Sequence, residues 1–262
     1  MKIKPKKSLG QNFLIDKNIL EKISNSTQFE KDSTIIEIGP GTGNLTEFLL
    51  KKNPKKIILI EKDNSLVKLL KNKFLNNVEI INEDILKINK NNFLNEKLII
   101  FGNLPYNISS QILAKLIINK ENLNYQKLVF MFQKELADRI LSNVNSKNYG
   151  RLSILSNWRF NIKKILDINP NSFYPKPKIK STLLLFTPKK NIFKFKDPKN
   201  LEYVTRVFFN QKRKKIKKPL IILFGKKLDL LNKIDLDVNL RPQNISTDKY
   251  FEIVKEFEKL TQ

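Results

Sequence analysis

The chain has 262 residues, a formal net charge of +25 and a sequence pI near 10.0, and it contains neither cysteine nor histidine. These absences exclude a disulfide framework, thiolate or imidazole metal sites, cysteine or histidine nucleophiles and a histidine base. Any chemistry must therefore use carboxylates, amides, hydroxyls, aromatic rings or a bound cofactor.

The positive charge favours a polyanionic partner such as nucleic acid, because each phosphate that a basic side chain neutralises releases counterions. The alternative is a drift of composition toward lysine, since 44 of the 50 basic residues are lysines. Of these two interpretations, the charge favours nucleic acid.

The N-terminal residues are basic, and no apolar segment follows them that would act as a signal sequence. No apolar run along the chain approaches the ~20 residues needed to span a membrane. We therefore expect a cytoplasmic protein without a membrane partner.

Seven short segments of the first 190 residues are nearly continuously apolar, as strands buried on both faces are. They are 34–38, 56–61, 78–83, 98–102, 128–132, 161–168 and 182–186. Apolar residues at helical spacing separate some of them, at 45–49, 66–74 and 112–117. Because the first five strands alternate with helices, the pattern predicts an α/β fold with a mostly parallel, doubly wound sheet. Only a loop joins the last two strands, so we expect one of them to be antiparallel, at the edge of the sheet.

The composition changes after Pro188. Residues 176–227 hold seventeen lysines or arginines and only two acids. Helical patterns return at about 201–210, 216–223 and 248–260. We therefore expect two domains, with the sheet in residues 1–187 and a small, basic, all-helical domain in residues 188–262.

The first predicted strand runs into the glycine-rich sequence IEIGPGTGNL. Gly39, Gly41 and Gly43 allow a sharp turn and let the backbone approach a ligand at the start of the next helix. Their spacing is G-x-G-x-G instead of the G-x-G-x-x-G dinucleotide fingerprint, which argues against a nicotinamide cofactor.

Acidic residues stand at the ends of the next two strands. Glu61 ends the second strand, where a carboxylate can accept hydrogen bonds from both hydroxyls of a ribose. Asp84 ends the third strand and is placed to accept from the amino group of an adenine. Either acid alone is typical of a solvated strand end. Together with the glycine-rich end of the first strand, the two acids mark three strand ends at one edge of an open sheet. This combination favours an adenosyl cofactor.

The fourth strand ends in the sequence Asn103-Leu104-Pro105-Tyr106. Pro105 fixes the chain and leaves the carbonyl of Leu104 free to point at a ligand. With the side-chain oxygen of Asn103 it makes two acceptors, which suit an amino group with two N–H bonds, and the face of Tyr106 suits a flat ring. Hydrogen bonds of this kind would draw an exocyclic amine toward tetrahedral geometry and make its nitrogen nucleophilic. The alternative is an ordinary strand-to-helix turn with a side-chain cap.

These motifs together resemble the S-adenosylmethionine-dependent adenine-N6 methyltransferases. Four further motifs narrow the resemblance to the ribosomal RNA adenine dimethyltransferase family, which acts on small-subunit (16S) RNA. They are KSLGQNFL at 7–14, YGRLS at 149–153, FYPKPKIKS at 173–181 and FFNQKRKKI at 208–216. The motifs occur in order over nearly the whole chain.

The resemblance implies a class I, Rossmann-like methyltransferase fold with S-adenosyl-L-methionine as cofactor. It implies transfer of methyl groups to N6 of two adjacent adenines in the 3′-terminal hairpin loop of small-subunit RNA. The product would be two N6,N6-dimethyladenines, made during ribosome biogenesis on a 30S assembly intermediate. We expect a monomer without a metal.

The resemblance also implies which residues hold the cofactor. Asn12 and Leu14 would help to cover it, and the glycine loop would receive its methionine end. Glu61 would bind the ribose, and Asp84, with Ile85 beside it, would bind the adenine.

At the target end, the resemblance implies that Asn103, next to the cofactor, and the carbonyl of Leu104 hold the reacting N6. Tyr106 and Phe173 would form a sandwich around the target base. A basic cluster would contact the RNA: Lys212, Arg213, Lys214 and Lys215.

The sequence departs from the family pattern at KRKKIKKPL, residues 212–220, where the family has Arg-Arg-Lys followed by Thr-Leu. We expect Pro219 to stop or kink the helix there, which would alter RNA contacts but not the chemistry. The alternative for the basic cluster is a solvated face. We expect Trp158 to belong to the core.

Three other functions compete with this interpretation. The nearest is the large-subunit RNA methyltransferase branch that confers antibiotic resistance and shares the central motifs. A DNA adenine methyltransferase is disfavoured because no target-recognition insertion is present. A largely non-catalytic factor in ribosome assembly or transcription would keep the fold, but the intact motifs at 39–43 and 103–106 argue for retained activity.

Overall fold

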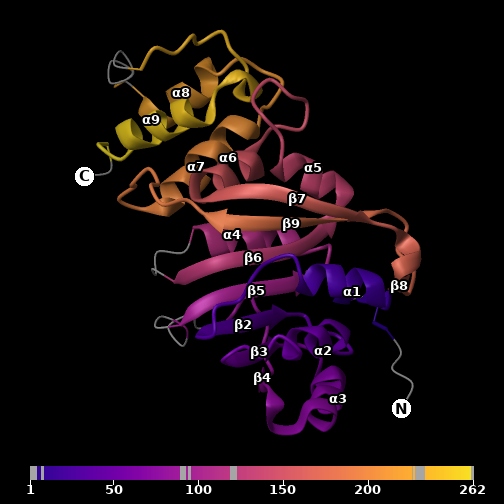
Figure 1. Ribbon diagram of the computed structural model, residues 1–262. Helices are drawn as coiled ribbons and strands as arrows, with labels where there is room; N and C mark the ends of the chain where they lie inside the picture. The colour runs from indigo at the N-terminus through magenta and orange to yellow at the C-terminus, as the bar shows by residue number, and fades with distance from the viewer. Residues whose placement is uncertain are drawn as a thin grey trace. The chain divides into compact units, whose positions relative to one another are not determined.

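The computed structural model describes residues 5–6, 9–88, 93, 96–118, 123–225, 227 and 234–260. The chain forms two compact units (Figure 1). The first consists of residues 1–113, 121–137 and 161–188, and the second of residues 114–120, 138–160 and 189–262. The second unit therefore includes two segments that precede residue 188 in the chain. The expected division into a catalytic part at 1–187 and an RNA-binding part at 188–262 remains a prediction.

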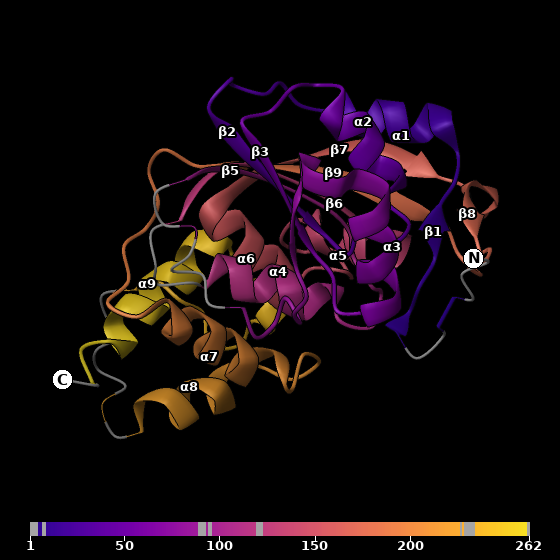
Figure 2. The ribbon, with the colours of Figure 1, turned by 90° about the horizontal axis from the view of Figure 1, so that it is seen from below.

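The first unit is built around a seven-stranded sheet with the order β4-β3-β2-β5-β6-β9-β7 (Figures 1 and 2). Its strands are β2 (Ser33–Ile38), β3 (Lys56–Ile60), β4 (Glu79–Ile81), β5 (Lys97–Asn103), β6 (Asn124–Gln133), β7 (Phe160–Ile168) and β9 (Ser181–Pro188). The pairs from β4 to β6 are parallel, whereas β9 pairs with β6 in the antiparallel direction. A separate two-stranded sheet pairs β1 (Phe13–Leu14) with β8 (Phe173–Tyr174). The expectation of a mostly parallel α/β sheet is confirmed.

The expectation that the antiparallel strand lies at the edge is wrong. β9 lies between β6 and β7, and β7 forms the edge. The first four residues of β9 are buried, whereas β7 exposes polar side chains, among them Asn161, Lys163 and Lys164. A strand with charged side chains is better suited to an edge, where it also discourages pairing with other chains.

Three helices follow the first strands: α1 (Lys17–Ser24), α2 (Asn44–Leu50) and α3 (Asn64–Phe74). Figure 2 shows them grouped on one side of the sheet. Their apolar residues share one core with alternate positions of the strands, such as Ile57 and Leu59 of β3 and Ile99 and Phe101 of β5. Alternate residues of a strand face the same side, so this face of the sheet is the one that the three helices cover.

Two further helices follow β5 and β6, namely α4 (Ser109–Ile117) and α5 (Lys134–Ile140). Short 3₁₀ helices occur at Leu75–Asn77, Pro170–Ser172 and Pro242–Asn244. No helix in the part of the chain that the structure describes is long and apolar enough to cross a membrane.

The second unit is helical, with α6 (Arg151–Arg159), α7 (Pro198–Phe209), α8 (Lys217–Phe224) and α9 (Thr247–Phe257). Its core includes Trp158, which is 3% exposed and donates from its indole nitrogen to the carbonyl of Phe193 at 2.7 Å. The expectation that Trp158 is a core residue is therefore confirmed. Phe208 and Tyr250 are fully buried in the same unit, with their ring centroids 5.2 Å apart.

The expectation that Pro219 stops or kinks a helix is wrong. α8 begins at Lys217 and continues to Phe224, so Pro219 is its third residue. The first N–H groups of a helix have no partner within the helix, and a proline in the first turn therefore removes no helical hydrogen bond. Pro219 is also buried, so its ring adds apolar contact at this position.

Candidate active site

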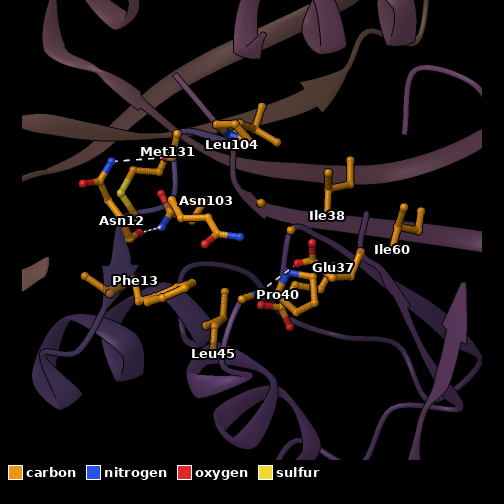
Figure 3. A pocket seen from close by; sticks show the side chains of 18 of the residues that line it. Asn12, Phe13, Glu37, Ile38, Pro40, Leu45, Ile60, Asn103, Leu104 and Met131 are labelled. Carbon is orange, nitrogen blue, oxygen red and sulfur yellow. Dashed lines mark hydrogen bonds between the residues drawn. The ribbon is translucent and has the colours of Figure 1, made fainter. Parts of the chain in front are cut away.

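A cavity of about 230 Å³ lies at the carboxyl ends of β2, β3 and β5 in the first unit (Figure 3). Its walls also include the glycine loop after β2, the loop after β4 and the N-terminal segment 9–14. Because these strands are parallel, their carboxyl ends meet at one edge of the sheet. The cavity brings together most of the residues predicted to bind a cofactor: Asn12, Leu14, Gly39, Gly41, Glu61, Asp84, Ile85 and Asn103.

The glycine loop of residues 39–43 requires glycine for two different reasons. Gly41 has φ of 59°, and a Cβ there would lie 2.7 Å from the ring of Phe13, so only glycine lets the N-terminal segment approach the loop. Gly43 has φ of 75° and is not among the residues that line the cavity. A Cβ at Gly43 would lie 2.5 Å from the ring of Phe74. Glycine at this position therefore allows α2 to pack against α3.

Glu61, directly after β3, is 7% exposed and lines the cavity. Its Oε1 accepts from the backbone N–H of Asp63 at 2.8 Å, and its Oε2 accepts from that of Gly41 at 3.4 Å. Burial raises the pKa of the Glu61 carboxyl, while these two N–H groups act in the opposite direction. Each carboxylate oxygen has a second acceptor site. Glu61 can therefore still accept hydrogen bonds from hydroxyl groups within the cavity.

Asp84 is held in a more solvated environment at the same edge. Its Oδ1 accepts from the backbone N–H of Leu86, and its Oδ2 from the ammonium of Lys62, both at 2.9 Å. The N–H of Leu86 contributes most to lowering the pKa of the Asp84 carboxyl, and Lys62 adds to the effect. Asp84 is thus an ionised acceptor beside the apolar side chain of Ile85, which also lines the cavity.

Glu37 lines the cavity too, although the sequence analysis did not select it. It is 3% exposed and is the last residue but one of β2, and its Oε2 accepts from the hydroxyl of Thr46 at 2.6 Å. Burial raises the pKa of the Glu37 carboxyl to about 7, and the charge of Glu61 adds to that rise. The signal that would have found it is an acid that follows two isoleucines within a strand expected to be buried on both faces.

The amide of Asn103 is oriented by the N-terminal segment. Its Nδ2 donates to the backbone carbonyl of Asn12 at 2.8 Å (Figure 3). In the described part of the chain, neither Asn103 Oδ1 nor the carbonyl oxygen of Leu104 accepts a hydrogen bond. Asn103, Leu104, Pro105 and Tyr106 all line the cavity. That the two acceptors act together on a target amine beside the ring of Tyr106 stays a prediction.

Tyr106 and Phe173 have different surroundings. The hydroxyl of Tyr106 is hydrogen-bonded to that of Ser181 at 2.7 Å, and burial raises the pKa of Tyr106. Phe173 is 3% exposed, pairs with Leu14 across β8 and β1, and belongs to the core cluster. It is not among the residues that line the cavity. The sandwich of a base between these two rings therefore stays a prediction.

Comparisons with known proteins agree over nearly the whole chain. A profile of the family described as "Ribosomal RNA adenine dimethylase" matches residues 2–259. The ribosomal RNA small subunit methyltransferase A of Pelagibacter ubique is 57% identical over 261 residues, which is 99% of each chain. The protein of the same name from Borreliella burgdorferi is 43% identical over 256 residues, or 96% of this chain and 88% of its relative.

The chain belongs to the ribosomal RNA adenine dimethylase family. Among solved structures, a dimethyladenosine transferase from Plasmodium falciparum matches 94% of this chain and 97% of its own, with a TM-score of 0.81 and 30% identity. The 23S rRNA methyltransferase ErmE matches 95% of this chain and all of its own at 20% identity, with a TM-score of 0.67, and so shares the fold. This family member is a methyltransferase, and its cofactor is S-adenosyl-L-methionine.

The cavity of this dimethylase has the features that such a cofactor needs. The missing side chain at Gly41 leaves the loop backbone at the wall, and Glu61 offers acceptors for ribose hydroxyls. Glu37 offers a second carboxyl, and apolar side chains including Ile38 and Ile60 complete the walls. When bound, S-adenosyl-L-methionine supplies an electrophilic methyl group. We take Glu61 and Asp84 as the residues that would hold its ribose and adenine.

The basic cluster of residues 212–215 lies in the second unit of the dimethylase, before α8. Lys212 donates to the carbonyl of Lys147 at 2.5 Å, and burial, with the charges of Arg139 and Lys147, lowers the pKa of Lys212. Lys215 donates to Asn239 Oδ1 at 2.9 Å and is otherwise exposed. Arg213 and Lys214 are exposed as well. Three of the four basic side chains are therefore accessible to a partner.

Proposed function

We propose that this enzyme methylates N6 of two adjacent adenines in the 3′-terminal hairpin loop of small-subunit ribosomal RNA, twice on each. The observation that carries the proposal is the pair of acceptors at the end of β5. Asn103, Leu104 and Tyr106 all line the cavity, and neither Asn103 Oδ1 nor the carbonyl of Leu104 accepts a hydrogen bond from any described residue. The names of the relatives, small subunit methyltransferase A and dimethyladenosine transferase, support the same substrate.

The chemistry follows from what these acceptors do to an amine. The exocyclic nitrogen of adenine is a poor nucleophile because its lone pair is delocalised into the ring. Two acceptors that bind its N–H bonds favour the tetrahedral geometry of the transition state, in which the lone pair is available for attack. Asn103 Nδ2 donates a hydrogen bond to the carbonyl of Asn12, which fixes the orientation of the Asn103 amide. Asn103 Oδ1 is then the atom that would accept from the substrate. As the bond between N6 and the methyl group forms, the bond between that methyl group and the sulfur of the cofactor would break, with S-adenosylhomocysteine as the leaving group. The proton that N6 would then carry passes to water, so no side-chain base is needed.

The target must reach these acceptors as an unstacked base. A hairpin loop exposes its bases at lower cost than a duplex, because the loop bases are already unpaired. The half-buried ring of Tyr106, fixed through Ser181, would provide a face on which such a base can stack.

The same proposal includes the substrate's context. We place the enzyme in the cytoplasm, acting as a monomer on a 30S assembly intermediate. Arg213, Lys214 and Lys215 would contact phosphates of the ribosomal RNA and hold the subunit without reading its bases. Methylation would then mark a stage of ribosome biogenesis.

Transfer of tritiated methyl groups to purified undermethylated subunits tests this function. We expect label in small subunits only, and mass spectrometry should map dimethyladenine to two adjacent positions of the 3′-terminal loop. Label in large-subunit RNA would favour the resistance-type alternative. Tight binding to small subunits without methyl transfer would favour a non-catalytic assembly factor.

A further inference from the structure

A segment at the N-terminus lies along the cavity and is held at several points. We call residues 9–14 the strap, and all six of them line the cavity. The carbonyl of Leu14 accepts from Asn44 Nδ2 at 2.8 Å, and the carbonyl of Asn12 accepts from Asn103 Nδ2 at 2.8 Å. One of these contacts therefore joins the strap directly to the amide that would act on the target amine.

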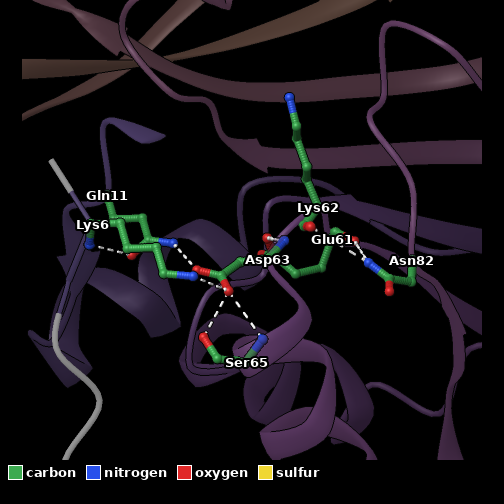
Figure 4. Close-up of polar contacts among 7 residues, drawn as sticks. All are labelled: Lys6, Gln11, Glu61, Lys62, Asp63, Ser65 and Asn82. Atoms are coloured by element: carbon green, nitrogen blue, oxygen red, sulfur yellow. Dashed lines mark hydrogen bonds and ion pairs between the residues drawn. The ribbon is translucent and has the colours of Figure 1, made fainter. Parts of the chain in front are cut away.

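Another contact of the strap is made by the side chain of Asp63, a residue that does not line the cavity. Asp63 Oδ2 accepts from Gln11 Nε2 at 2.9 Å, and its Oδ1 accepts from the ammonium of Lys6 at 2.7 Å (Figure 4). The backbone N–H of Lys6 in turn donates to Gln11 Oε1 at 2.7 Å. The carboxylate thus binds both the strap and a residue that precedes it in the chain.

The carboxylate of Asp63 is buried and is held in place by further hydrogen bonds. Its side chain is 1% exposed, and Oδ1 also accepts from the backbone N–H and the hydroxyl of Ser65. Burial alone would raise the pKa of Asp63, but the hydrogen bonds from Lys6, Ser65 and Gln11 outweigh it and lower that pKa. The carboxylate is therefore ionised and has donors on both oxygens.

Asp63 also contacts Glu61, the residue assigned to the ribose. Its backbone N–H donates to Glu61 Oε1 at 2.8 Å, so Asp63 holds Glu61 with its main chain and the strap with its side chain. Gln11 and Asn12 are adjacent in sequence. A continuous chain of contacts therefore runs from Glu61 through Asp63 and the strap to Asn103.

We propose that Asp63 is a positioning residue, whose carboxylate clamps the strap through Gln11 and Lys6 and so fixes both the bound cofactor and the amide of Asn103. The proposal rests on the cofactor and target sites assigned above. Loosening the clamp would let the cofactor leave faster and would let the carbonyl of Asn12 drift from the amide that it orients.

The first test replaces Asp63 by Asn and measures dissociation of S-adenosylhomocysteine by stopped-flow fluorescence. Asn keeps one acceptor for Ser65 but turns an amino group toward Gln11 or Lys6. Loss of hydrogen bonds to a charged group should raise the dissociation rate about tenfold or more. At saturating cofactor, the single-turnover methylation rate should also fall, because Asn103 is less well oriented. Asp32→Asn is the matched control, since Asp32 likewise pairs with a lysine, Lys97 at 2.9 Å, on the surface of the same unit.

A rescue experiment separates positioning from a structural role of Asp63 at the start of α3. Gln11→Glu combined with Asp63→Asn reverses donor and acceptor and should restore the dissociation rate to within about threefold of the wild type, because the single hydrogen bond is re-formed. Gln11→Ala leaves Asp63 and its contact with Ser65 intact and should still speed dissociation, which keeps the test valid if Asp63→Asn does not fold.

Wild-type dissociation in Asp63→Asn or in Gln11→Ala would overturn the proposal. So would a double variant no better than Asp63→Asn, because a residue that only begins α3 cannot be rescued from the strap. Methyl transfer by the wild-type protein is measured in parallel. A wild type that binds S-adenosylhomocysteine without transferring methyl groups would refute the proposed function instead.

Discussion

Glu37 and Glu61 are two buried carboxyl groups that line one cavity. Their pKa values are shifted in the opposite direction from that of Asp84, which lies at the same edge of the sheet. Burial raises the pKa of the first two, whereas the N–H of Leu86 and the charge of Lys62 lower the pKa of Asp84. A charged ligand that enters the cavity therefore meets one fully ionised acid and two acids whose ionisation the protein opposes.

The raised pKa of Glu37 predicts how stability depends on pH. Its folded value of about 7 lies above the ordinary value of 4.5, so its contribution is full below pH 4.5 and is lost as the pH rises toward 7. Glu37→Gln stays neutral and should gain stability relative to the wild type over this window. The gain should be on the order of 1–3 kcal/mol by linkage. Urea unfolding of the cofactor-free proteins at pH 5 and pH 8 measures it, and an equal difference at both values would refute the assigned shift.

The assigned cofactor contacts predict the effect of removing charge from the two strand-end acids. Glu61→Gln and Asp84→Asn should each weaken binding of S-adenosyl-L-methionine about tenfold to a hundredfold, since a hydrogen bond to a charged group contributes ~1.5–3 kcal/mol. Titration calorimetry measures the affinity. Glu79→Gln, whose carboxylate pairs with Lys56 on the surface, is the control and should bind normally. Wild-type affinity in both cavity variants would mean that the cofactor binds elsewhere.

At the scale of elements, periodicity and alternation predicted the seven strands of the main sheet and six of the helices. The order of the last two strands did not follow from a loop connection, because burial decides which strand takes the edge. The buried β9 takes the inner place and leaves the edge to the more polar β7. Helix α1 was not predicted, although Ile19, Leu20 and Ile23 have helical spacing and Asp16 caps its N-terminus. The prediction for Pro219 was wrong because a proline interrupts a helix only beyond the first turn, and Pro219 lies within the first turn of α8.

Those parts of the candidate site that consist of a short motif at the end of a single strand were predictable from the sequence. The acids and the acceptors of 103–104 meet because parallel strands bring their carboxyl ends together. Contacts between segments distant in sequence were not predictable. The clamp of Asp63 on Gln11 joins residues 52 positions apart, and the packing of Gly43 against Phe74 likewise joins two separate segments. No local pattern encodes such pairs.

The different roles of the loop glycines lead to a test of stability. Gly43→Ala would place a Cβ 2.5 Å from the ring of Phe74 at a positive φ, whereas a Cβ at Gly39 would meet no atom closer than 3.9 Å. We expect the free energy of unfolding to fall by about 2–4 kcal/mol for Gly43→Ala, from left-handed strain and overpacking together, and by about 1 kcal/mol for Gly39→Ala. Urea unfolding measures both. An equal loss of free energy of unfolding in the two variants would show that the packing of α2 against α3 does not require glycine at position 43.

At the scale of the whole molecule, the net charge of +25 has two explanations, RNA binding and drift toward lysine. RNA binding requires the basic residues at particular positions of the surface, whereas drift makes every exposed lysine equivalent. Replacing Lys212, Arg213, Lys214 and Lys215 by Gln should weaken binding to small subunits. It should also flatten the log–log salt dependence of that binding by ~0.7–0.9 for each phosphate that the variant no longer neutralises. Cofactor affinity should not change.

A control variant removes the same charge elsewhere, with Gln at four exposed lysines of the first unit: Lys51, Lys52, Lys55 and Lys56. We expect its salt slope to stay closer to that of the wild type. Parallel slopes for both variants would favour drift and would remove the RNA-docking role from residues 212–215.

The proposed methyl transfer depends on the oxygen of Asn103 acting on the target amine. The most direct measurement is the single-turnover methylation rate of Asn103→Ala on undermethylated small subunits at saturating S-adenosyl-L-methionine, with cofactor affinity measured alongside. Loss of one acceptor that acts in the transition state should slow methyl transfer by roughly 10²–10³, by analogy with the removal of an oxyanion-hole donor. Asn103→Ala also loses the contact with Asn12, so cofactor affinity should fall, but saturating cofactor removes that change from the measured rate. A variant that methylates at nearly the wild-type rate would contradict the mechanism.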